Sequence, residues 1–179
     1  MAHWRGSHAD PVVSPDLHSP SGENPSGYRY ARYYNTKRIE ALALAWLLRH
    51  YPLALELVRG LDVCTDELGV PTWVLVPLLT YVHQAGEVAS TAVQRQRGLS
   101  LPPLRTTVHA GEDFVHLLTG LRYVDEAINY LQLREGDRIG HGIALGVDPQ
   151  DWARRVGRIS MRREERLFDL VWELSLIHI

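Results

Sequence analysis

Cysteine is almost absent from this sequence: Cys64 is the single one in 179 residues. One thiol excludes an intrachain disulfide framework and a cysteine-rich zinc module, and it fits a reducing compartment. Long apolar runs are missing too, since the longest, residues 41–48, is far too short to cross a bilayer. The first residues also lack the apolar segment of a signal peptide. We therefore expect a cytoplasmic protein without a membrane partner.

Neither positive nor negative charge predominates, because the formal net charge is −2 at pH 7. Such a balance provides neither the basic field of a nucleic-acid-binding protein nor an acidic tail. Residues 28–34 mix tyrosines with arginines, which would suit stacking on bases, but the pattern is short and we interpret it as an amphipathic strand. Nucleic acid is therefore not an expected partner. Glycine-rich phosphate-binding loops and the cytidine-deaminase cysteine pattern are absent from the sequence as well.

The chain divides by composition near residue 35. Residues 1–35 hold four of the ten prolines among serine, glycine and asparagine, which is typical of an irregular, loop-rich segment. From residue 36 to 175 apolar residues recur with regular periods, and Asn35 or Thr36 would cap the first helix. The expected elements are helices near 36–51, 72–96 (kinked or restarted at Pro77), 121–131, 149 onward and 167–174, and strands at 57–64, 104–109 and 138–145.

Helices that alternate with apolar strands indicate an α/β domain with a parallel sheet. About three strands are expected, whereas a complete (β/α)₈ barrel needs about 250 residues. We therefore predict a partial TIM-type barrel, truncated at both ends, over residues 36–175. A doubly wound sheet remains an alternative, because both folds place functional groups at the carboxyl ends of their strands. Residues 176–179 are expected to be a non-native tail.

Polar motifs follow three successive strands. Leu-Asp-Val-Cys-Thr-Asp-Glu spans residues 61–67, His-Ala-Gly-Glu spans 109–112, and Arg-Ile-Gly-His-Gly spans 138–142. His141 follows His109 by about one βαβ repeat, so both histidines are expected at the same edge of the sheet.

In this order and spacing, the three motifs resemble the C-terminal half of the adenosine deaminase family. The resemblance covers residues 57–145 and implies a zinc-dependent barrel hydrolase that converts adenosine, or a related adenine nucleoside or nucleotide, to the inosine product and ammonia. Residues 112–116 and 144–149 are similar to the larger bacterial adenosine-deaminase-like proteins of phage-defence systems.

The resemblance implies a role for each motif residue. His109 would be a ligand of Zn²⁺, which makes water a strong nucleophile near neutral pH. Glu112 would deliver a proton to the purine ring as water attacks it. His141 would hydrogen-bond and orient the attacking water.

Substrate contacts are expected from Gly111, Asp66 and Glu67. Gly111 keeps side-chain bulk low, so that a substrate can lie against the backbone. Thr65 stands where the family usually has a glycine before its acidic pair, so purine preference is expected to differ here.

Other interpretations stay open at this point. A histidine at a strand end is commonly solvated, and Glu112 would also suit a helix N-terminus. The family takes further zinc ligands from a His-x-His motif and a late aspartate, and neither motif occurs in this sequence. The isolated chain is therefore expected to be inactive, because its metal site is incomplete. One alternative is a non-catalytic fragment that serves as an assembly or interaction element, and another is a different amidohydrolase substrate. The sequence leaves open whether a full-length protein forms a homo-oligomer.

Overall fold

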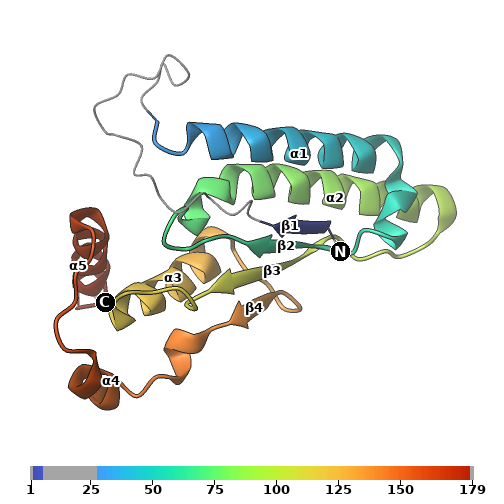
Figure 1. Cartoon of the computed structure of the whole chain (residues 1–179). Helices are drawn as coiled ribbons and strands as arrows, with labels where there is room; N and C mark the ends of the chain where they lie inside the picture. The colour runs from blue at the N-terminus through green and yellow to red at the C-terminus, as the bar shows by residue number, and fades with distance from the viewer. Residues whose placement is uncertain (1, 6–27, 178–179) are drawn as a thin grey trace.

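A computed structural model describes residues 2–5 and 28–177 of the chain (Figure 1). Its strands form one parallel sheet in the order β1-β2-β3-β4. Their bounds are Ala2–Arg5 for β1, Gly60–Cys64 for β2, Arg105–Ala110 for β3 and Arg138–His141 for β4. The expected α/β class with a parallel sheet is confirmed, and a barrel remains a prediction.

The helices occupy the connections between the strands. Their bounds are Ala31–His50 for α1, Val76–Arg97 for α2, Leu117–Tyr130 for α3, Pro149–Val156 for α4 and Arg163–Ile177 for α5. Short 3₁₀ helices lie at Pro52–Glu56, Thr72–Leu75 and Ile143–Gly146. Helices α1 and α2 run side by side along one side of the sheet in Figure 1. Among the described residues, no helix has the length and apolarity needed to cross a membrane.

Side-chain alternation gives the sheet two different faces. Leu61 and Val63 of β2, and Val108 of β3, are fully buried in the core that also includes α1 and α2. Successive residues of a strand point to opposite faces, so Asp62 and His109 belong to the other face. The polar motifs therefore lie on the face that turns away from this core.

Local signals explain where several elements begin and end. Pro77 lies in the first turn of α2, where a missing N–H costs nothing, and the restart predicted there is confirmed. Gly98 ends α2 in a left-handed conformation with φ of 67°. Strand β4 stops at His141 instead of continuing to residue 145, because His141 and Gly142 both have positive φ, 59° and 55°.

Two parts of residues 1–35, the segment expected to be irregular, have regular structure. Residues 2–5 form a strand that pairs in parallel with β2, and residues 31–35 belong to α1. Residues 28–34 are a turn and a helix start instead of a strand. The Tyr30 ring packs edge-on against Trp73 and Tyr28. The N-cap is Tyr30, not Asn35 or Thr36. Residues 6–27 lie outside the described part of the chain.

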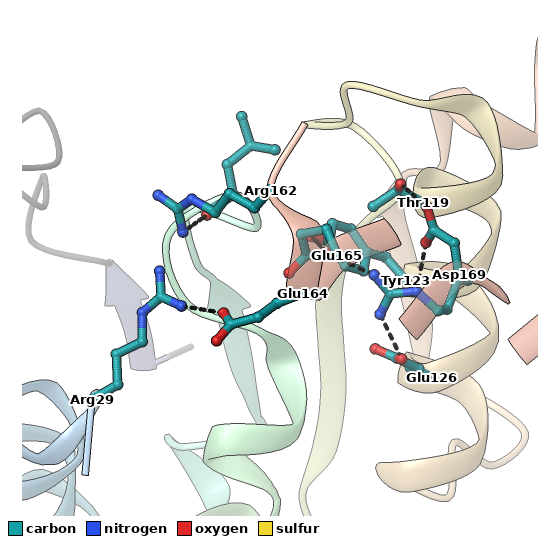
Figure 2. Close-up of polar contacts among 10 residues, drawn as sticks. Arg29, Thr119, Tyr123, Glu126, Arg162, Glu164, Glu165 and Asp169 are labelled. Atoms are coloured by element: carbon teal, nitrogen blue, oxygen red, sulfur yellow. Dashed lines mark hydrogen bonds and ion pairs between the residues drawn. The ribbon is translucent and has the colours of Figure 1, made fainter. Parts of the chain in front are cut away.

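Helix α5 joins the fold through polar contacts (Figure 2). Arg122 of α3 is buried and pairs with Glu126, with Glu165 and with Asp169 at 2.7, 2.6 and 2.9 Å. The side chains on the predicted apolar face of α5 are exposed: Leu167, Leu170, Val171 and Leu174. Leu176 and Ile177, expected in a non-native tail, end this helix, and residues 178–179 are not described.

Candidate metal and catalytic site

The register of the sheet brings the two predicted histidines together. His109 is level with Gly140, and Ala110 is level with His141, on the neighbouring parallel strands β3 and β4. The two imidazole rings meet edge to face, with centroids 4.8 Å apart. The sequence prediction that both histidines lie at one edge of the sheet is therefore confirmed.

Glu112 lies between these two rings. Its Oε1 is 3.3 Å from Nδ1 of His109, and its Oε2 is 2.5 Å from Nδ1 of His141. Glu112 and His109 are half-buried, whereas His141 is exposed. The carboxyl group can therefore exchange a proton with either imidazole while the His141 side remains open to a ligand.

Two glycines make room for this arrangement. A Cβ on Gly140 would lie 2.7 Å from Cδ2 of His109, so only glycine lets the ring rest against β4. Gly111 has a φ of 73°, and a Cβ there would lie 2.7 Å from Cγ2 of Val124. The glycine expected to leave space for a substrate thus also lets the turn between His109 and Glu112 pack against α3.

Glu67 holds the backbone of that turn. It is 2% exposed, and its carboxylate accepts N–H bonds from Gly111, Glu112 and Asp113 at 2.8, 2.9 and 2.9 Å. Burial raises the pKa of Glu67, and the three N–H bonds oppose this shift. The sequence predicts substrate contact for Glu67, but in the structure its carboxylate contacts this backbone instead. We therefore describe Glu67 as a positioning residue.

Asp66 remains available for the predicted substrate contact. Its side chain is exposed, and its Oδ1 accepts the N–H of Leu68 at 3.1 Å. The pKa of Asp113 is raised by burial and by the charges of Glu112 and Asp66, so the open side of the site is acidic. Thr65, which precedes Asp66, is buried, and its Oγ1 has no hydrogen-bond partner among the described residues.

Sequence reasoning missed two further members of the site. Sγ of Cys64 lies 3.4 Å from Nε2 of His109, and Oδ1 of Asp62 lies 3.7 Å from the same nitrogen. Both residues belong to β2, two positions apart, and therefore share a face of the sheet. Both residues belong to the motif at residues 61–67. Their closeness to His109 can be inferred only once β2 is known to pair with β3.

Among the residues that the structure describes, two groups of side chains have the spacing to hold a metal ion. One consists of His109, Glu112 and His141, and the other of Asp62, Cys64 and His109; within each group the donor atoms all lie within 4.8 Å of one another. Imidazole, carboxylate and thiolate are the donors that zinc prefers in proteins. The residues present therefore fit a zinc-type ion.

Comparison with known proteins assigns no function to this site. No protein-family model matches the chain, and no curated protein matches it either. A function for this chain therefore has to follow from the chemistry of its site.

Proposed function

We propose that the chain carries part of the active site of an adenosine-deaminase-like hydrolase that replaces the 6-amino group of an adenine nucleoside or nucleotide with oxygen. The observation that supports the proposal is the contact of Glu112 with both His109 and His141. These are the three residues to which the resemblance assigns metal binding, proton donation and water orientation. A deaminase needs them within reach of one small substrate.

A zinc-type ion would be held through His109. When bound, Zn²⁺ supplies the acidity that makes water a strong nucleophile near neutral pH. The water adds to C6 of the purine and gives one of its protons to His141. The hydroxyl group that remains on C6 gives its proton to the amino nitrogen as the bond from C6 to that nitrogen breaks, which releases ammonia and leaves a carbonyl oxygen on C6. This addition ends the ring's aromaticity, so the adjacent ring nitrogen has to gain a proton.

Glu112 is the proton donor in this proposal, because its half-buried carboxyl group lies beside the exposed His141, where the site is open to a ligand. His141 hydrogen-bonds the attacking water and returns a proton to Glu112, whose Oε2 lies 2.5 Å from Nδ1 of His141. Gly111 and Asp66 contact the purine. The single cysteine fits a cytoplasmic location for this activity.

A direct assay tests the proposal. The purified chain is loaded with Zn²⁺ and incubated with adenosine, deoxyadenosine and adenine nucleotides. The sequence alone predicts that the isolated chain is inactive, because the family's other zinc ligands are missing. Asp62, Cys64 and His109 together offer three donor atoms for a metal ion, so we expect one of these substrates to yield its inosine product and ammonia in equal amounts. A zinc-loaded, folded chain that converts none of them would contradict the proposal.

A second candidate function is an assembly element without catalysis. The exposed apolar side chains of α5 favour it: Leu167, Phe168, Leu170, Val171 and Leu174. Light scattering at increasing protein concentration tests this alternative. Concentration-dependent association that Leu170→Glu abolishes, in a chain without turnover, would favour assembly over catalysis.

A further inference from the structure

His109 presents its two ring nitrogens to two different groups of side chains. Nδ1 lies 3.3 Å from Oε1 of Glu112. Nε2 faces β2 instead, 3.4 Å from Sγ of Cys64 and 3.7 Å from Oδ1 of Asp62. A histidine that binds a metal through one nitrogen commonly donates the other N–H to a carboxylate. His109 has the surroundings for both contacts at once.

The separations on the Nε2 side match those between ligands of one tetrahedral zinc ion. Bonds of about 2.3 Å to sulfur and about 2.1 Å to nitrogen or oxygen place two ligands roughly 3.6 Å apart for N and S, and roughly 3.4 Å apart for N and O. The distances from Nε2 to Sγ of Cys64 and to Oδ1 of Asp62, 3.4 and 3.7 Å, are close to these values. Little movement is therefore needed to bind an ion there.

The alternative group, on the Nδ1 side, matches less well. Oε2 of Glu112 lies 2.5 Å from Nδ1 of His141. That distance is typical of a strong hydrogen bond and is roughly 1 Å shorter than the separation of two ligands on one zinc ion. Glu112 would also lose its role as proton donor if it were a metal ligand. The two residues are thus better suited to exchange a proton than to share a metal.

We infer that Asp62, Cys64 and His109 bind a zinc-type divalent ion through the Cys64 thiolate, the Asp62 carboxylate and Nε2 of His109. The thiol releases its proton to solvent when the ion binds. Three protein donors are the number that catalytic zinc sites use. The catalytic meaning of this site rests on the proposed function, because it leaves Glu112 and His141 to act on the substrate.

Cobalt binding tests the inference, because Co²⁺ replaces Zn²⁺ and absorbs in the near ultraviolet when a thiolate binds it. Cys64 is the single cysteine, so such a band reports on this residue alone. We expect the wild-type chain to develop the band and to saturate at one Co²⁺ per chain. Cys64→Ser and His109→Ala should lose it, and Zn²⁺ affinity should fall at least about tenfold in each.

Glu112→Gln is the matched control, because it alters the contacts at Nδ1 of His109 and Nδ1 of His141 and leaves the proposed metal ligands themselves unchanged. It should keep the band and its Co²⁺ stoichiometry. A wild-type chain without the band, or a band that persists in His109→Ala, would overturn the inference. X-ray absorption of the zinc-loaded wild-type chain needs no variant: we expect one sulfur at about 2.3 Å from the metal, and a shell of nitrogen and oxygen alone would overturn the inference.

Ammonia release, measured on the same preparations, separates this inference from the proposed function. A thiolate band without deamination would support the metal ligands and contradict the deaminase. Deamination by a chain whose metal shows no sulfur ligand would support the deaminase and overturn the role of Cys64.

Discussion

The carboxylate of Glu67 accepts the backbone N–H of Glu112, 45 residues further along the chain, at 2.9 Å. This contact joins the loop after β2 to the turn after β3. It fixes the peptide that carries the proposed proton donor, and it does so from a buried position that a substrate does not reach.

Replacing Glu67 by glutamine should loosen that turn. The amide retains one acceptor oxygen, so at least one of the three N–H groups loses its partner, at a cost of about 1–3 kcal/mol. Burial raises the pKa of Glu67, so removing the charge offsets part of the loss, and we expect about 1–2 kcal/mol in urea unfolding. The control Asp66→Asn changes an exposed neighbour and should shift stability by less than about 0.5 kcal/mol. Equal stability of Glu67→Gln and wild type would contradict the role of Glu67.

Gly140→Ala should displace the His109 ring. The new Cβ would lie 2.7 Å from Cδ2 and 3.1 Å from Nε2 of that ring. We expect Zn²⁺ affinity to fall by about 10–100-fold, measured by competition with a chelating dye. Gly146→Ala is the control, because a Cβ at that position meets nothing within 4 Å and it should bind zinc normally. Wild-type affinity in Gly140→Ala would mean that His109 does not bind the metal.

Arg122→Met should detach α5 from α3. The substitution leaves Glu126, Glu165 and Asp169 without their shared cation, and breaking a buried ion pair in this way costs about 3–5 kcal/mol. The pair of Arg29 with Glu164 is exposed, so Arg29→Gln should cost under about 1 kcal/mol. Both values follow from denaturant unfolding. A similar small cost for the two substitutions would show that α5 does not depend on Arg122.

His83 should make the fold sensitive to mild acid. Burial lowers the pKa of His83 below its usual value of 6.5, although the charges of Asp137 and Glu87 oppose this shift. Below about pH 6.5 the unfolded chain therefore takes up a proton that the folded chain excludes, and the free energy of unfolding falls. His83→Gln can keep the contact with Oγ1 of Thr106 and should reduce this fall between about pH 7 and pH 5.5. Equal pH slopes in the two proteins would contradict the assignment.

Apolar periodicity and local start and stop signals were sufficient to predict much of the fold. Strands β2 and β3 overlap the segments predicted as strands, and Pro77 and Gly98 mark the ends of α2, so these elements could be predicted from local signals. The spacing of His109 and His141 likewise predicted their meeting, because one βαβ repeat returns the chain to the same edge of the sheet.

Contacts between distant segments could not be read in the same way. The strand at residues 2–5 depends on pairing with β2, and a four-residue segment is too short to predict that pairing from its sequence. The place of Cys64 beside His109 depends on which strands are neighbours and in what register. Asp169 is fully buried in a helix whose apolar side chains are exposed, because Arg122 and Thr119 provide its partners. The apolar periodicity of α5 alone would predict that the opposite face of this helix is buried.

The measurement that tests the central claim most directly compares adenosine turnover by the zinc-loaded wild-type chain with turnover by Glu112→Gln, with bound zinc quantified in both. General acid catalysis contributes about 10²–10⁴-fold, so we expect kcat to fall at least about 100-fold while zinc stays at one per chain. Undiminished turnover in Glu112→Gln would contradict the assignment of Glu112 as the proton donor of a deaminase site.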